Sequence, residues 1–276
     1  MKFFLKCFLI CVVLTTSSAN EVFIDVDVFM AGSADFYLLD VREKTKFERL
    51  HFPGAMHVHL ASFNDRNSHK SSILKNFEGL KAALKEEGLV WQGPVIIVGN
   101  STAGWGEEGR LYWILKNLGF EGVKILDGGF RALKKMRDSW SESPLKSEET
   151  RHKFEPEKKP NFLELQALET IKKGQFIDVR NLMEFAGATP FGSSWGGHID
   201  GAKSLPWTQL FDFRGKLAND AREKLEGLTR GRQPIFYCTA GYRSAMVYAV
   251  ADHFGIQSLN YDGSWYEYSH LNPKKK

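Results

Sequence analysis

Cys238 is the residue of this sequence best placed to act as a nucleophile. It opens a loop of small and polar residues that reaches Arg243, with four residues between the two. Residues 234–237 predict a buried strand before this loop, and residues 244–251 predict a helix after it. A strand–loop–helix turn directs backbone N–H groups and the helix dipole into the loop, which stabilises a thiolate. The alternative is a buried cysteine that packs as a small apolar residue.

The other two cysteines, Cys7 and Cys11, lie in an N-terminal segment with the layout of a secretory signal peptide. Lysines precede a short apolar run, and small residues up to Ala19 provide a cleavage site. The apolar run is too short to span about 30 Å of hydrocarbon. We therefore predict a signal peptide over residues 1–19 and an exported protein, periplasmic or secreted. Cys238 would then be the single cysteine of the mature chain and could not form an internal disulfide.

Composition and length narrow the class of protein. The chain has 276 residues, 43% of them hydrophobic, which is enough for the cores of two domains. Its net charge of +4 becomes smaller still when the two signal-peptide lysines are removed. No nucleic-acid or membrane-surface role follows from so small a charge, and we expect a monomer that has no membrane contact after signal cleavage.

The sequence repeats one plan in its two halves. Asp-Val-Arg ends a short apolar run at residues 40–42 and again at residues 178–180. Apart from local insertions, matched positions are separated by 135 to 138 residues, and each half alternates short apolar runs with helical stretches. This pattern predicts two α/β domains, each a small, mostly parallel sheet flanked by helices. The expected boundaries are residues 20–140 for the first domain, 141–160 for an extended linker and 161–272 for the catalytic domain.

The two halves differ in the loop where chemistry would occur. After the first half's buried strand at residues 94–98, the loop of residues 99–110 is longer and has no cysteine. Only the second half carries the nucleophile Cys238. We therefore expect the first domain to be inactive and to form one wall of the site, and the aromatic insertion at residues 188–195 to line its entrance.

Taken in order and twice over, these motifs resemble the rhodanese family of sulfurtransferases, in the tandem form with an inactive first domain. The loop that Cys238 opens is more similar to the loops of bacterial rhodaneses than to those of mitochondrial-type enzymes. The resemblance implies that Cys238 takes a sulfane sulfur from a small anionic donor such as thiosulfate and becomes a persulfide. The sulfur would then pass to a thiophilic acceptor, which the sequence leaves open among cyanide, sulfite and a thiol.

The chemistry of the loop agrees with this resemblance. A persulfide anion needs hydrogen-bond donors around its outer sulfur, and backbone amides come close in a loop of small residues. Arg243 could hold an anionic donor as a bidentate clamp, or it could form an ion pair with a nearby carboxylate. The predicted substrate-binding residues are Arg243, Thr239, Ala240, Gly241, Tyr242 and Ser244.

Glu184 departs from the pattern of the resembled family. Mitochondrial-type thiosulfate and mercaptopyruvate sulfurtransferases have an arginine at this position, and it helps to hold the anionic donor. A carboxylate there would repel thiosulfate, so the natural donor stays open. Asp178 and Arg180 are secondary candidates, for which an internal ion pair or cap is the favoured interpretation. We expect His198 to be anchored to the backbone rather than to act as a base.

Two other classes of protein remain as alternatives. A cysteine phosphatase or arsenate reductase also has a cysteine and an arginine on an anion-binding loop, but phosphatases place five residues between the two. A non-catalytic rhodanese module could dock partners or carry sulfur. No group of cysteines, histidines or carboxylates has metal-site spacing, and no glycine-rich loop matches a nucleotide fingerprint. We therefore expect neither a metal nor a cofactor.

Overall fold

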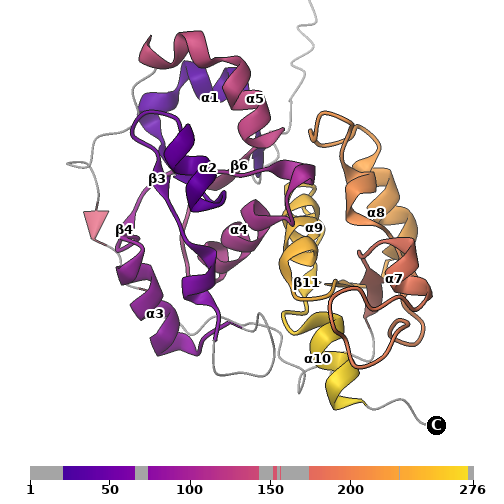
Figure 1. The fold of residues 1–276 in the computed structure, drawn as a ribbon. Helices are drawn as coiled ribbons and strands as arrows, with labels where there is room; N and C mark the ends of the chain where they lie inside the picture. The colour runs from indigo at the N-terminus through magenta and orange to yellow at the C-terminus, as the bar shows by residue number, and fades with distance from the viewer. Residues whose placement is uncertain are drawn as a thin grey trace, which may run out of the picture.

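The structure is a computed structural model that describes residues 21–65, 74–142, 152–153, 156, 174–229 and 231–272. The predicted signal peptide, most of the predicted linker and the start of the second domain lie outside the described residues. Within the described part, no helix is both long enough and apolar enough to cross a membrane. Figure 1 shows two domains side by side, the first running from indigo to magenta and the second from orange to yellow.

The first domain is built on a parallel sheet in the order β1-β6-β5-β2-β3. The strand at its centre, Val95–Val98, is apolar and buried along its whole length, as expected for a parallel strand that is covered on both faces. The strands are β1 (Phe23–Ile24), β2 (Tyr37–Asp40), β3 (Met56–His57), β5 (Val95–Val98) and β6 (Val123–Leu126). The helices are α1 (Val26–Ala31), α2 (Lys44–Arg49), α3 (Phe77–Glu86), α4 (Glu107–Asn117) and α5 (Gly129–Lys135), with short 3₁₀ turns η1 (Ser33–Asp35), η2 (Leu60–Phe63), η3 (Ser101–Ala103) and η4 (Arg137–Glu142).

The second domain repeats the plan with a separate parallel sheet in the order β11-β10-β8-β9. Its strands are β8 (Gln175–Asp178), β9 (Lys203–Ser204), β10 (Pro234–Tyr237) and β11 (Leu259–Asn260). Its helical elements are α7 (Leu182–Ala186), η6 (Trp207–Leu210), α8 (Ala221–Thr229), α9 (Tyr242–His253) and α10 (Ser264–Leu271). The predicted fold of two α/β domains with parallel sheets is therefore confirmed.

One short segment of the predicted linker is ordered against the first domain. Residues His152–Lys153 form β7, which pairs antiparallel with β4 (Trp91–Gln92). The linker thus follows the first domain over this stretch instead of only connecting two separate bodies.

The domains pack together through α4 and α9, which lie against each other in the centre of the molecule (Figure 1). A single apolar cluster runs through this contact from both domains, with Leu111 and Ile114 on one side and Met246 and Val250 on the other. A Cβ atom added to Gly109 of α4 would lie 2.2 Å from the Cα atom of Met246. The two helices therefore approach as closely as they do only because Gly109 has no side chain.

Ion pairs complete the contact between the domains. Arg110 of α4 pairs with Asp262 of the second domain at 2.5 Å, and Lys116 pairs with Asp252 at 2.5 Å. The Arg110 pair is buried, whereas the Lys116 pair is partly exposed. Because a large apolar contact and buried polar contacts fix the two domains relative to each other, side chains of the first domain can take part in a site on the second.

Candidate active site at the carboxyl end of β10

Cys238 follows directly after β10, at the carboxyl end of the second sheet, where open α/β sheets bind ligands. Gly241 ends the loop as the N-cap of α9, with a φ angle of +81°. A Cβ atom there would lie 2.7 Å from the carbonyl oxygen of Asp262 and 2.8 Å from a guanidinium nitrogen of Arg110. The loop therefore requires glycine at this position, both for its backbone conformation and for the close approach of neighbouring atoms.

The segment that follows β11 holds the backbone of Cys238 in place. The N–H of Cys238 donates to the hydroxyl of Ser264 at 3.1 Å, and its carbonyl accepts the N–H of Trp265 at 2.9 Å. Ser264 has a φ angle of +51°, which is uncommon for a residue with a side chain. The strained backbone at Ser264 and the buried partners around it fix the direction in which the thiol points.

The thiol of Cys238 faces hydrogen-bond donors. The N–H of Gly241 lies 3.1 Å from Sγ, and the hydroxyl of Ser244 lies 3.6 Å from it. Burial alone would raise the pKa of Cys238. The positive charge of Arg243 and hydrogen bonds from Ser244 and Ala240 outweigh burial and hold the pKa below its ordinary value. The loop therefore favours an anion on sulfur, as expected from its strand–loop–helix pattern.

Arg243 forms the ion pair that was the alternative to a free clamp. Its Nη1 and Nη2 atoms each lie 2.8 Å from an oxygen of Glu184, and Nη2 also donates to the hydroxyl of Thr239 at 2.7 Å. The Thr239 hydroxyl in turn donates to Glu184 at 2.8 Å. Burial would raise the pKa of Glu184, but the bonds from Arg243 and Thr239 lower it overall, so the carboxylate is ionised.

Glu184 lies next to the catalytic loop through its partner Arg243, although it does not line the cavity described below. The short helix α7 places it: Asn181 caps the helix by accepting the N–H of Glu184 at 2.9 Å, and Glu184 accepts the N–H of Asn181 at 3.2 Å. The same carboxylate therefore closes a capping box and neutralises the arginine next to the thiol.

Asp178 and Arg180 form the internal ion pair that was the favoured interpretation. Arg180 Nη2 lies 2.5 Å from Asp178, donates to the carbonyl of Gly197 at 2.6 Å, and its guanidinium lies over the ring of Trp265. Neither residue lines the cavity described below. His198 is held by the backbone, with Nδ1 3.0 Å from the carbonyl of Phe185.

A cavity of about 350 Å³ opens above the thiol. Of the predicted substrate-binding residues, Gly241 and Ser244 do not line the cavity, although both contact Sγ of Cys238. The residues that line the cavity are Trp105, Phe191, Cys238, Thr239, Ala240, Tyr242 and Arg243.

Two aromatic rings from different domains stand at the mouth of this cavity. Trp105 belongs to the first domain and Phe191 to the aromatic insertion of the second, and their rings meet edge to face with centroids 5.3 Å apart. The guanidinium of Arg243 lies 5.6 Å from the Trp105 centroid and 5.8 Å from the Phe191 centroid. Sequence reasoning expected a wall from the first domain and an entrance at the insertion, but it did not single out Trp105. The feature of the sequence that could have indicated Trp105 is an aromatic residue flanked by Gly104 and Gly106.

The fold and the site together define a tandem α/β protein with a cysteine on an anion-stabilising loop. The family model described as "Rhodanese-like domain" matches residues 27–136 and 163–271. The chain therefore belongs to the rhodanese family and contains two copies of the domain.

Individual relatives agree with this assignment. A protein of Saccharopolyspora erythraea named "Putative thiosulfate sulfurtransferase" is 28% identical over 83% of this chain and 85% of its own length. The sulfur carrier protein TtuD of Thermus thermophilus is 28% identical over 64% of this chain and 68% of its own. Among solved structures, the 3-mercaptopyruvate sulfurtransferase of Leishmania major has a TM-score of 0.72 at 20% identity, covering 94% of this chain and 76% of that one, and so shares the fold.

Proposed function

We propose that this protein is a sulfurtransferase in which Cys238 carries the sulfur as a persulfide. The observation that carries this proposal is the position of the thiol: buried, at the carboxyl end of β10, with the N–H of Gly241 3.1 Å from Sγ and a lowered pKa. In the first step the thiolate attacks the outer sulfur of thiosulfate, the S–S bond breaks, and sulfite leaves with the bonding electron pair. In the second step cyanide attacks the outer sulfur, forming thiocyanate and restoring the thiolate.

The loop is suited to both charge states of this cycle. A persulfide keeps one negative charge but moves it outward by one sulfur atom, into the cavity lined by Thr239, Ala240 and Tyr242. Donors that are fixed before reaction stabilise that charge without reorganising. The names of the thiosulfate sulfurtransferase relatives support the same reaction class.

The ion pair between Arg243 and Glu184 affects which sulfur donors the site can accept. Thiosulfate is a dianion, and the cation at its binding site is already neutralised by a carboxylate 2.8 Å away. We propose that thiosulfate is consequently a weak donor and that less charged donors, such as 3-mercaptopyruvate or the persulfide of a small thiol, react more efficiently. A cysteine that is 1% exposed beneath two aromatic rings suits small donors and acceptors better than direct docking of a carrier protein.

The test is intact-mass detection after incubation with thiosulfate or with 3-mercaptopyruvate. Wild-type protein should gain one sulfur, about 32 Da, and should lose it again when cyanide is added and thiocyanate appears. Cys238→Ser, which keeps the size and hydrogen bonding of the side chain, should show neither event. Absence of the mass increase with both donors, or its persistence in Cys238→Ser, would overturn the proposal.

A non-catalytic carrier is the second candidate, and the resemblance to the sulfur carrier TtuD is its support. Multiple turnovers with two small substrates separate the two roles, because a carrier releases its sulfur only to a protein partner.

We also propose that the protein is exported after removal of residues 1–19. N-terminal sequencing of protein from the native host should begin near Asn20, and an intact Met1 in the cytoplasm would contradict this.

A further inference from the structure

A second cavity, of about 480 Å³, lies in the first domain, at the place that corresponds to the catalytic loop of the second. It borders the turn Ser101–Ala103, which follows β5 just as Cys238 follows β10. The first domain has no thiol there, and the catalytic cycle proposed above makes no use of this cavity. Its lining residues are Asn100, Ser101, Thr102, Ala103, Gly128, Phe130, Arg131, Lys134, Lys135 and Arg214.

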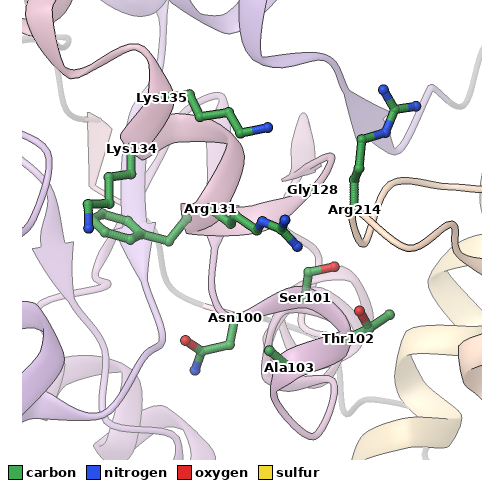
Figure 2. Close-up of a pocket in the computed structure, with 10 residues that line it drawn as sticks. Asn100, Ser101, Thr102, Ala103, Gly128, Arg131, Lys134, Lys135 and Arg214 are labelled. Carbon is green, nitrogen blue, oxygen red and sulfur yellow. The ribbon is translucent and has the colours of Figure 1, made fainter.

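The lining of this cavity is basic. It includes two arginines and two lysines, and no aspartate or glutamate. Figure 2 shows the guanidinium of Arg131 between α5 and the turn that carries Ser101, with Lys135 and Arg214 around the same space. Like charges gathered on a surface repel each other, and a bound anion relieves that repulsion.

The carboxylates of neighbouring segments neutralise only part of the group. Within the described residues, neither Arg131 nor Lys135 forms an ion pair, and Arg131 makes one long hydrogen bond of 3.4 Å to the carbonyl of Phe213. Arg214 forms an ion pair with Asp212 through Nε, and its guanidinium also lies over the ring of Phe213; the hydrogen bond to Asp212 leaves its terminal nitrogens for a ligand. The nearby Asp25 is taken by Lys216.

The cavity also joins the two domains. Arg131 and Lys135 come from α5 of the first domain, and Arg214 comes from the loop between η6 and α8 of the second. That loop is held against the first domain by the hydroxyl of Ser101, which donates to the carbonyl of Gly215 at 2.5 Å. A Cβ atom on Gly215 would lie 2.5 Å from that hydroxyl, so the contact depends on the glycine.

We propose that this cavity binds a small molecule with two or more linked phosphate groups. Two guanidinium forks match the geometry of phosphate oxygens, and an ammonium adds a third charge. The volume falls in the range of small-molecule sites. Phe130, Ala103 and Gly128 provide apolar surface for the rest of such a ligand. The near-neutral charge of the whole chain argues against a long nucleic acid as the ligand.

The test is calorimetric titration of the full-length protein with sodium tripolyphosphate at 50 mM and 200 mM salt. Wild-type protein should bind, more weakly at the higher salt. Arg131→Ala/Lys135→Ala should weaken binding at least tenfold. Lys81→Ala/Lys85→Ala, which removes the same charge from α3, should bind as wild type does.

Sulfur transfer by the Arg131→Ala/Lys135→Ala variant should be unchanged, which shows that the variant is folded and separates this proposal from the proposed function. No binding by wild type, or equal weakening in both double variants, would overturn the proposal. Tighter binding of a single-stranded RNA than of tripolyphosphate, lost in the Arg131→Ala/Lys135→Ala variant, would overturn the assignment of a small ligand.

Discussion

The two domains place the same strand–loop–helix unit at the same edge of the sheet but aim its backbone amides at different groups. In the first domain the N–H of Ser101 donates to the buried carboxyl of Glu108 at 2.6 Å. In the second domain the N–H of Gly241 points at the sulfur of Cys238 at 3.1 Å. In the first domain the loop's N–H group is therefore hydrogen-bonded to a side chain of the following helix. In the second domain the corresponding N–H group points at the sulfur atom that reacts.

The difference is one of electrostatics within a common fold. Glu108 belongs to α4 and is 1% exposed, and one of its oxygens has no hydrogen-bond partner within the described residues. Burial raises its pKa to about 7. Cys238 is just as buried, but the charge of Arg243 and the donors of its loop lower its pKa instead. Burial alone thus does not make a reactive site; the orientation of donors and one nearby cation do.

The largest effect should come from Gly241→Ala, which removes the glycine that makes the catalytic loop possible. The positive φ angle and the overlap with Asp262 together should lower the free energy of unfolding by about 4 kcal/mol. Gly255→Ala is the matched control, because Gly255 also has a positive φ angle of +71° but has no atom within 4 Å of an added Cβ. It should cost only about 1 kcal/mol. Urea unfolding measures both, and equal losses would show that the close approach at Gly241 is unimportant.

Glu108→Gln should change how stability depends on pH. The pKa of Glu108 rises from 4.5 to about 7 on folding, so the folded state binds the proton more tightly. Its contribution is fully present below pH 4.5 and is lost as the pH rises through about 7, a change of about 3 kcal/mol. Glu108→Gln should remove this loss of stability at high pH, so the variant should be more stable than wild type at pH 8.

Urea unfolding at pH 5 and pH 8 measures this difference. Glu86→Gln, at an exposed position on α3, should follow wild type at both values. If wild type and Glu108→Gln lose stability in parallel between the two pH values, Glu108 is not the group responsible.

Glu184→Gln should make the catalytic loop more receptive to anions. The variant keeps the size of the side chain but releases the charge of Arg243 from its carboxylate partner. We expect kcat/KM for thiosulfate to rise about tenfold, equivalent to about 1.4 kcal/mol. Glu184→Asp, which keeps the charge, should give no such rise. An unchanged or lower value in Glu184→Gln would show that the ion pair does not limit use of the dianion.

The smallest effect should come from Trp105→Ala, which removes the first domain's contribution to the mouth of the cavity. KM for the donor should rise about threefold with little change in kcat, because the ring lines the cavity in which we expect the donor to bind and does not contact Sγ through any hydrogen bond. Phe213→Ala, at an exposed position outside this cavity, should leave both constants unchanged. A fall in kcat with unchanged KM would place Trp105 nearer the chemistry than the structure does.

Much of the fold could be predicted from the sequence because the duplication shows its main motifs twice. Asp-Val-Arg ends β2 and β8, and in both places it forms the same buried ion pair. The nucleophile and its loop were also predictable, since local strand–loop–helix chemistry determines them.

What could not be predicted depends on contacts between distant segments. The partner of Arg243 lies 59 residues earlier in the chain, and Trp105 reaches the site from the other domain. No local pattern in the sequence shows that the Glu108 carboxyl accepts the hydrogen bond from the backbone N–H of Ser101 in the first domain's loop. These contacts follow from how α4, α7 and α9 pack, which the periodicity of the sequence does not specify.

The most direct test of the account is the pKa of the Cys238 thiol, measured from the pH dependence of its alkylation by iodoacetamide. Peptide mass spectrometry assigns the reaction to Cys238 and separates it from Cys7 and Cys11. We predict a midpoint clearly below the ordinary cysteine value of about 8.5, and a higher midpoint in Arg243→Gln. A wild-type midpoint at or above about 8.5 would contradict the claim that this loop, and not burial, governs the charge on sulfur.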